Sequence, residues 1–93
     1  MRYNIYLVQE AVDDLNQLIA TDRAAIREHI AAHLGFEPTK ASKSRIKRLK
    51  GLSKPQYQLR VDDIRVYYDV KNNEVEILAI IKKDVADGLQ PKG

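Results

Sequence analysis

Two arginines stand on either side of a short polar break in the sequence, where strand periodicity would bring them together. Arg60 belongs to the alternating run 57–61 (YQLRV), and Arg65 belongs to the alternating run 64–68 (IRVYY). Side chains two residues apart share one face of a strand, and a two-residue turn places the strand ends side by side. Because adjacent guanidinium groups repel each other and each matches a phosphate group bidentately, the pair predicts a site for a phosphate-like anion.

The nearby acidic residues leave a second interpretation of this arginine pair open. Asp62, Asp63 or Asp69 could form ion pairs with the arginines, which would then be ordinary surface residues. Residues 40–65 carry nine Lys/Arg and two acidic residues, a net charge of +7, while the whole chain carries +3. Such a block indicates a polyanionic partner, either nucleic acid or an acidic protein segment. Six residues of the block are expected to bind nucleic acid, namely Lys43, Arg45, Lys47, Arg48, Lys50 and Lys54.

Tyr67 is expected on the same strand face as Arg65, two residues away. This combination suits single-stranded RNA, because arginine holds the backbone while an aromatic ring stacks on a base, which is worth about 1–3 kcal/mol per base. The alternative for Tyr67 is ordinary packing between neighbouring strands.

Other catalytic or binding sites have little support in the sequence. His29 and His33 lie four residues apart on a predicted helix, but they lack the His-Glu-x-x-His pattern of zinc proteases and an evident third ligand. We therefore expect both histidines on the surface, away from the basic strands, and we expect neither a metal nor a small-molecule cofactor. No glycine-rich phosphate loop and no nucleophile elbow occur in the sequence. The remaining enzymatic chemistry is metal-free cleavage of RNA, in which the 2′-hydroxyl attacks the adjacent phosphate and cations stabilise the transition state.

The N-terminal part predicts a strand followed by a helical hairpin. Residues 2–7 alternate as a strand does, and apolar residues then recur at spacings of three and four over residues 9–20, as on one face of a helix. Thr21 and Asp22 are capping types that should separate this helix from the next. The second helix should end at Gly35, in the left-handed conformation that glycine favours.

The C-terminal part predicts an antiparallel sheet. Strands 57–61 and 64–69 are separated by a tight turn, and a strand over 75–81 follows a second turn that contains asparagine. This last strand is apolar on both faces and should be central. The basic segment 45–52 is either an extended crossing into the sheet or a short helical turn. With the first strand as a fourth, residues 1–93 form one α+β domain, in which an N-terminal strand and a helical hairpin pack on a twisted antiparallel β-sheet.

Length and composition set further expectations. A chain of 93 residues buries only about 60–65% of its unfolded surface, and without cysteine it has no disulfide to compensate. A partner protein would therefore add stability. No stretch approaches the ~18 apolar residues of a membrane span, and the N-terminus has no secretory pattern. We expect a cytoplasmic protein with no membrane association.

Four segments resemble, in order and spacing, the RelE branch of the RelE/ParE toxin superfamily. They are 48–52 (RLKGL), 57–61 (YQLRV), 64–70 (IRVYYDV) and 75–81 (VEILAII). The family pattern is roughly K-L-x-G, Y-x-[LI]-R, a turn, [YIF]-R-[VL]-[IV]-[YF], a turn, and V-x-[IV]-L-x-I. The preceding helical hairpin agrees in length and position, so the resemblance covers nearly the whole chain.

The resemblance implies the toxin of a type II toxin–antitoxin system. Such toxins of the RelE type cut mRNA in the ribosomal A site without metal, and a cognate antitoxin silences them, so the ribosome, mRNA and an antitoxin are the expected partners. Arg65 matches the catalytic sheet arginine of the family, and Arg60 matches a basic strand residue. Lys82 or Lys83 falls where the family has His or Arg. Together with Tyr67, these are the expected catalytic residues.

Two positions depart from the family pattern. Gln58 stands where some members have a lysine, and many members place Tyr or Phe after the last strand, where this chain has Val85, Ala86 and Leu89. No aromatic residue follows Tyr68. A second interpretation therefore stays open, in which a non-catalytic toxin or binding protein of the same fold occupies the ribosome or, like ParE-type relatives, inhibits DNA gyrase.

Overall fold

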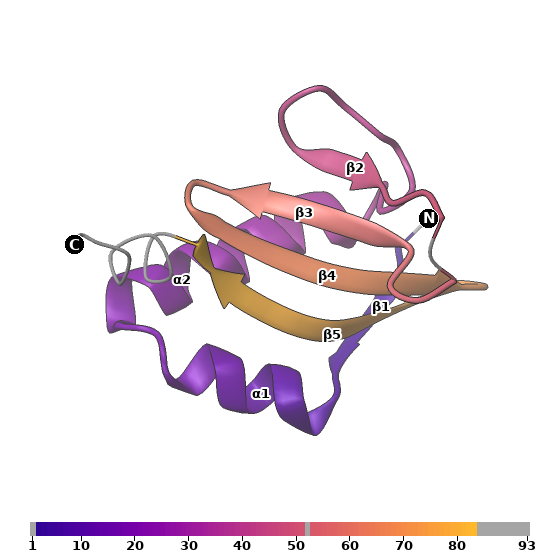
Figure 1. Ribbon diagram of the computed structural model, residues 1–93. Coiled ribbons are helices and arrows are strands. Elements are labelled where there is room, and N and C mark those ends of the chain that lie inside the picture. Colours follow the sequence, from indigo (N-terminus) through magenta and orange to yellow (C-terminus); the bar gives the residue numbers. More distant parts are fainter. Residues whose placement is uncertain (1, 52, 84–93) are drawn as a thin grey trace.

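The computed structural model describes residues 2–51 and 53–83. Met1, Leu52 and residues 84–93, which include the three positions where the family aromatic is missing, lie outside the described residues. Figure 1 shows the two helices together on one side of a sheet. Within the described ranges, no helix is long and apolar enough to cross a membrane. The elements are β1 (Asn4–Leu7), α1 (Gln9–Asn16), α2 (Ala20–His29), the π-helical turn η1 (Ile30–Leu34), β2 (Ile46–Arg48), β3 (Tyr57–Val61), β4 (Ile64–Lys71) and β5 (Glu74–Lys82).

The sheet contains five strands in the order β1-β5-β4-β3-β2. Strands β3 to β5 pair antiparallel in sequence, as expected. Strand β2 adds a further antiparallel strand beside β3, whereas β1 pairs in parallel with β5. The basic segment provides β2, so its extended alternative is correct, and β5 has a neighbour on both sides, which confirms its central place. The predicted α+β fold with a helical hairpin on a sheet is confirmed. The sheet is mixed rather than purely antiparallel, because residue alternation carries no information about strand direction.

The connection between the helices differs from the prediction. Helix α1 ends earlier than expected, and α2 begins at Ala20, so Thr21 and Asp22 lie in the first turn of α2 rather than before it. The predicted side-chain cap is therefore wrong, since the residue before α2 is Ile19, in an extended conformation and without a side-chain cap. Asp22 instead forms an ion pair with Lys82, at 2.9 Å from Oδ2 to Nζ. This contact ties the start of α2 to the end of β5.

The predicted left-handed helix end at Gly35 is also wrong. Helix α2 widens into η1, and Gly35 follows with a φ of −73°, in the right-handed region. A side chain at this position would place its Cβ 2.8 Å from the carbonyl oxygen of Ala31. The carbonyl of Gly35 accepts the backbone N–H of Tyr3 at 2.8 Å. Glycine is therefore required because a Cβ here would clash with the carbonyl of Ala31, and not for a left-handed backbone.

Halfway along strand β5, the buried side chains switch from one face of the strand to the other. Its pairing with β4 shifts at Leu78, which has no partner of its own in the register. Ile77 and Ile80 are consequently both buried and Ile81 is exposed, whereas uniform alternation predicted Ile77 and Ile81 on one face and Ile80 on the other. Asp14 of α1 accepts the backbone N–H of Ile80 at 2.9 Å, so the helix layer compensates for the irregular ladder.

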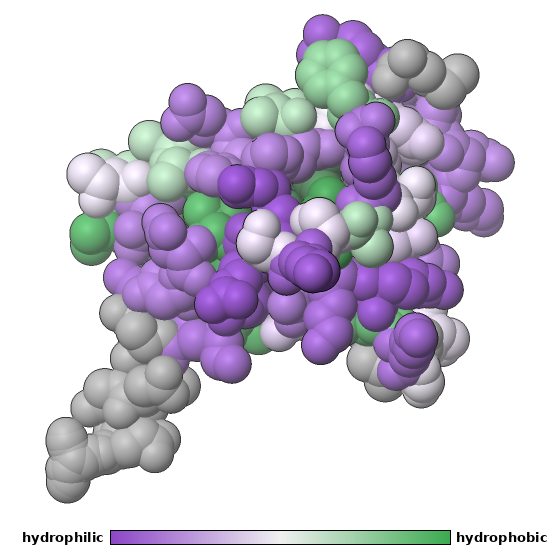
Figure 2. All heavy atoms as spheres, turned by 90° about the horizontal axis from the view of Figure 1, so that it is seen from above, coloured by the Kyte–Doolittle hydropathy of each residue, from purple (hydrophilic) through white to green (hydrophobic). Residues whose placement is uncertain are grey.

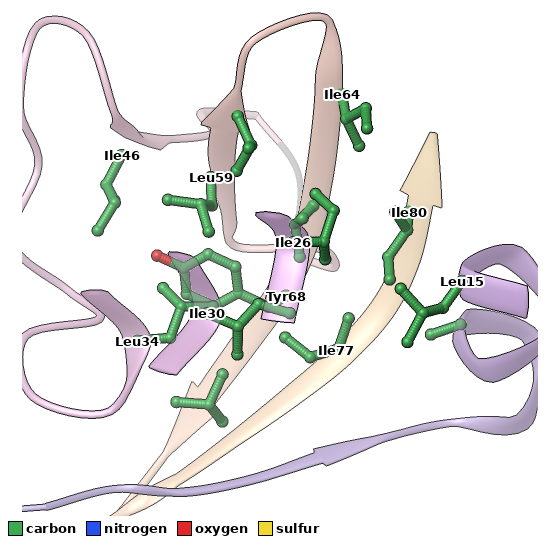
Figure 3. Close-up of a cluster of buried hydrophobic side chains, with 14 residues drawn as sticks. Leu15, Ile26, Ile30, Leu34, Ile46, Leu59, Ile64, Tyr68, Ile77 and Ile80 are labelled. Carbon is green, nitrogen blue, oxygen red and sulfur yellow. The ribbon is translucent and has the colours of Figure 1, made fainter. Parts of the chain in front are cut away.

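The core fills the space between the sheet and the helical hairpin. Figure 3 shows Leu15 of α1, Ile26 of α2 and Tyr68 of β4 pointing into one apolar layer. The inner faces of β3 and β4 contribute to this layer as predicted, because the two-residue period places every second side chain there. These buried residues are Leu59, Val61, Ile64, Val66 and Tyr68, and the half-buried Tyr57 stacks on Tyr68.

One buried polar group connects this core to the loop after η1. The hydroxyl of Tyr68 donates a hydrogen bond to the carbonyl oxygen of Pro38 at 2.6 Å. Burial, and after it the neighbouring Tyr57, raises the pKa of the Tyr68 hydroxyl far above its usual range. The hydroxyl therefore stays protonated and donating at neutral pH. The loop that continues towards β2 is thus fixed at its start.

Replacing Tyr68 with Phe should lower the free energy of unfolding by about 1–3 kcal/mol, because the buried carbonyl of Pro38 loses its donor. Tyr67→Phe, on the opposite face of the same strand, is the matched control and should change stability by less than about 0.5 kcal/mol. Urea unfolding followed by circular dichroism measures both variants. Equal effects of the two substitutions would show that the hydrogen bond adds nothing to stability.

Candidate nucleic-acid interface

The outer face of the sheet, opposite the helices, carries the polar side chains of β2, β3 and β4. Arg60 and Arg65 are direct cross-strand partners on β3 and β4, as the hairpin spacing predicted. The neighbouring row contains Lys47 of β2, Gln58 of β3 and Tyr67 of β4. Cross-strand partners have Cβ atoms about 4.5–5.5 Å apart, so the two rows form one polar surface. Figure 2, which views the molecule from above Figure 1, shows a surface that is mostly hydrophilic.

Five basic side chains line one pocket of about 210 Å³, which we call the cation pocket. Lys47, Arg60 and Arg65 reach it from the strands, while Lys43 and Arg45 reach it from the loop between η1 and β2. The strands and the loop thus concentrate positive charge around a hollow, as the binding of a phosphate-like anion requires. The lining is completed by Ser42, Ile46 and Gln58.

Ser42 fixes the loop side of the cation pocket. Its hydroxyl oxygen accepts the backbone N–H groups of Arg45 at 3.1 Å and Ile46 at 3.2 Å, and its own N–H donates to the carbonyl of Ile46 at 2.8 Å. The carbonyl of Arg45 accepts the N–H of Arg60 at 2.7 Å, which ties the loop to β3. Strand periodicity does not reveal Ser42 as a site residue. The available signal is a serine four residues before the first residue of a strand, a spacing typical of side-chain-to-backbone turns.

Arg65 is oriented by the turn that precedes it. Its Nη1 donates to the carbonyl oxygen of Asp62 at 2.9 Å and approaches that of Ile64 at 3.4 Å. Asp62 has a φ of 55°, in the left-handed region that aspartate tolerates, and the predicted tight turn is confirmed. Because guanidinium has five N–H donors in a fixed plane, these two carbonyl contacts leave donors for an anion.

The acidic residues near the cation pocket form no ion pair with its cations in the described part of the chain. Asp69 accepts the backbone N–H of Gln56 at 2.7 Å and lies 3.9 Å from Nζ of Lys54. Over residues 2–51 and 53–83, no carboxylate forms an ion pair with a cation of the pocket lining. The geometry therefore favours an anion site over the ion-pairing alternative.

Three of the predicted nucleic-acid-binding residues do not line the cation pocket. Arg48 stacks over the ring of Tyr57, with its guanidinium carbon 5.1 Å from the ring centroid. Lys54 pairs with carboxylates of β4 and β5, and Lys50 is exposed. The basic block is therefore divided between the two faces and the edge of the sheet, a division that a sum of charges along the sequence does not show.

The two lysines at the end of β5 occupy different environments. Lys82 is the cross-strand partner of the buried Ile64 and forms its ion pair with Asp22 of α2, so the structure does not bring it to the cation pocket. Lys83 is exposed, and its backbone N–H donates to the carbonyl of Asp63 at 2.7 Å. Lys83 consequently lies beside the turn that connects β3 to β4.

Tyr67 stands on the outer face between Gln58 of β3 and Ala79 of β5. It is half-buried and does not line the cation pocket. Its ring stacks on no other aromatic ring in the described part of the chain. The position is therefore compatible with stacking on a base at the margin of the arginine pair.

His29 of α2 contacts the basic loop that precedes β2. Nη1 of Arg45 approaches Nδ1 of His29 at 3.4 Å, and the rings of His29 and His33 are 5.5 Å apart. Partial burial, followed by the charges of Arg45 and His29, lowers the pKa of His33. The contact of His29 with Arg45 was not predicted, because the loop before β2 approaches the helix only in the folded protein. Among the described residues, no three potential metal ligands gather in one group.

Comparisons with known proteins agree with this architecture. The sequence itself matches no family model and no curated protein. The structure matches a chain of the archaeal RelE–RelB complex from Pyrococcus horikoshii, with a TM-score of 0.72 and 24% identity over 89% of this chain and 97% of that chain. A chain of the toxin–antitoxin complex RelBE2 from Mycobacterium tuberculosis gives a TM-score of 0.70 and 24% identity over 88% and 99% of the two chains. YoeB from Staphylococcus aureus, which was solved as a dimer, gives 0.62 and 21% over 85% and 94%.

Proposed function

We propose that this chain, which has the fold of the RelE toxins, is the toxin of a type II toxin–antitoxin system. In this proposal it is a ribosome-dependent, metal-independent mRNA endoribonuclease of the cytoplasm. The observation that carries the proposal is the cation pocket, where five basic side chains meet. None of them has a carboxylate partner in the described part of the chain. A phosphodiester would balance the positive charge of these side chains. Negative charge on its oxygens increases as cleavage proceeds, so the same cations would stabilise the transition state.

In the proposed reaction, the 2′-hydroxyl oxygen of RNA attacks the adjacent phosphorus and the bond to the 5′-oxygen breaks. The products are a 2′,3′-cyclic phosphate and a 5′-hydroxyl end, after one proton leaves the attacking oxygen and another reaches the leaving oxygen. Arg65 donates to the oxygens on which charge accumulates, while Arg60 and Lys47 bind flanking phosphates. Lys83, beside the β3–β4 turn, is the candidate acid, and Tyr67 stacks on a base.

A non-catalytic toxin of the same fold is the second candidate. It is favoured by the lining of the cation pocket, which contains no histidine and no carboxylate to act as a base. Such a protein would occupy the ribosome or inhibit DNA gyrase without cutting RNA.

Mapping of mRNA 5′ ends during cell-free translation tests the proposed nuclease activity, which should produce new ends inside coding regions. Arrested translation with intact mRNA would support ribosome occupation, and unaffected translation with lost DNA supercoiling would support gyrase inhibition.

The proposed cellular partner is a cognate antitoxin with an acidic or amphipathic segment that covers the cation pocket or the outer sheet face. The uncompensated charge of the pocket supports this partner. A ligand that binds only the folded state adds about 2.7 kcal/mol of stability at a hundred times its Kd. Co-expression with the product of the neighbouring open reading frame should therefore raise the Tm by roughly 10–20 °C. Lack of binding by that product, together with high stability of the isolated chain, would count against a paired system.

Lys47→Ala should weaken RNA binding and make it less dependent on salt. Lys47 lines the cation pocket, and each phosphate contact with single-stranded nucleic acid adds about 0.7 to the slope of log K against log salt concentration. The slope should fall by about that amount. Lys54→Ala is the matched control, because Lys54 is already paired with Asp69 and Glu76. Fluorescence anisotropy of a labelled RNA at several salt concentrations gives both slopes, and equal slopes would show that Lys47 makes no phosphate contact.

A further inference from the structure

A second hollow adjoins the cation pocket. It has a volume of about 250 Å³, and we call it the side pocket. Ser42, Arg45 and Ile46 line both hollows, so the two share one wall. A ligand bound in the cation pocket therefore touches residues that also border the side pocket. The rest of the side pocket is formed by the last helical turn and the following loop, through Ala32, His33, Phe36, Glu37 and Lys40.

Two rings give the side pocket flat surfaces. Phe36 is 51% exposed, and the guanidinium of Arg2 lies 5.3 Å from its ring centroid. The ring of Phe36 thus contacts the guanidinium of Arg2 and also borders the hollow. A second planar group in the hollow could stack on this ring. Burial lowers the pKa of His33 and favours the neutral ring, in which one nitrogen donates a hydrogen bond and the other accepts one.

The charged groups at the rim remain available to a ligand. Glu37 and Lys40 are 3.9 Å apart, with side chains 67% and 73% exposed. A pair as exposed as this contributes little, so both groups can turn towards a bound molecule. A volume of 250 Å³ lies below the range of about 300–1,000 Å³ typical of pockets for drug-sized ligands. The hollow therefore suits a single small planar group with polar edges.

We infer that the side pocket binds one nucleobase of an RNA chain whose phosphate group lies in the cation pocket. Arg45, in the shared wall, contacts the nucleotide between its base and its phosphate, while Phe36 stacks on the base. The inference rests on the proposed function as an RNA-binding toxin and adds a base-binding subsite, separate from Tyr67, at the edge of the sheet. Its main effect is affinity for single-stranded RNA, because stacking accepts every base.

The test measures binding of two labelled probes to the full chain by fluorescence anisotropy. One probe is a pentamer of uridylate, and the other has the same ribose phosphate chain without bases. Phe36→Ala should weaken binding of the uridylate probe about fivefold or more, the lower end of base stacking, and should leave binding of the base-free probe unchanged. Phe36→Tyr keeps a ring and should retain the affinity. Tyr6→Ala is the matched control, since Tyr6 is 46% exposed on β1 at the opposite edge of the sheet.

The outcomes separate this inference from the proposed function. Equal losses with both probes would overturn the inference, because they would show that Phe36 supports the cation pocket rather than a base. Affinities of Phe36→Ala that match those of Tyr6→Ala would overturn it as well. If mRNA is cut during translation but Phe36→Ala behaves like the control, the proposed function is supported and the inference of a base-binding side pocket is contradicted. If Phe36→Ala loses affinity only for the probe with bases but no mRNA is cut, the base-binding side pocket is supported and the proposed nuclease activity is contradicted.

Discussion

Arg65→Ala should lower the rate of mRNA cleavage by about 10²–10³-fold and remove growth arrest when the protein is induced. Loss of one donor to a developing oxyanion typically has an effect of this size. The side chain lies on the outer face, and its hydrogen bonds in the described structure go to carbonyl groups of its own turn. The core is therefore untouched, and the circular dichroism spectrum should stay unchanged.

Two further variants make this result specific. Arg48→Ala removes an arginine that stacks on Tyr57 outside the cation pocket, and it should retain most of the activity. Arg65→Lys keeps the charge but loses bidentate geometry, so it should recover only part of the rate. Full toxicity of a folded Arg65→Ala protein would exclude Arg65 from catalysis. Equal losses in Arg65→Ala and Arg48→Ala would point to total charge rather than to a site.

The protein should cut mRNA on programmed ribosomes at least about 10²-fold faster than free RNA. A general acid or base contributes about 10²–10⁴-fold, and the cation pocket has neither a histidine nor a carboxylate in its lining. Nδ1 of His29 lies 3.4 Å from Nη1 of Arg45, but His29 is not part of the pocket lining. Fixing the RNA in a bent, in-line geometry recovers a comparable factor through positioning. A rigid ribosomal A site provides that geometry, whereas flexible RNA in solution does not.

The experiment compares free mRNA with programmed ribosomes at equal protein and RNA concentrations, and quantifies the cut ends over time. Arg65→Ala serves as the background for both substrates. Efficient cutting of free RNA would show that the chain carries a complete acid–base pair, and that the cation pocket is not the whole catalytic site. Absence of cutting on both substrates would favour the non-catalytic toxin.

The predicted RelE-like fold is confirmed, and the arginine pair was the most predictable part of the candidate site. Two alternating runs around Asp62 and Asp63 determine both the turn and the register, so the sequence suffices to place Arg60 opposite Arg65. Helix periodicity likewise identifies the buried residues Ile26, Ile30 and Leu34 of the second helix and the turn that follows it. These are local patterns, in which neighbouring residues along the chain decide the outcome.

The features that could not be predicted depend on contacts between distant segments. The parallel pairing of β1 with β5, and the bond from Ile80 to Asp14, join parts of the chain that no local pattern connects. The same holds for the position of His29 beside Arg45, because the loop before β2 crosses α2 only in the folded protein. Consequently, the positions of Arg60 and Arg65 on the strands were predictable. The loop that forms the other wall of the cation pocket was not, and neither was the adjacent side pocket.

Strand β2 forms one edge of the sheet and has only three residues, of which Lys47 and Arg48 are exposed. An open edge is a template for strand addition by another molecule, and natural proteins protect such edges by short length and by lysines. The charges that we assign to RNA binding and to stacking on Tyr57 therefore also oppose aggregation. Replacing both with apolar, β-branched residues would weaken RNA binding and at the same time promote self-association. Inactive variants of this kind would accumulate as insoluble protein rather than as a soluble, harmless chain.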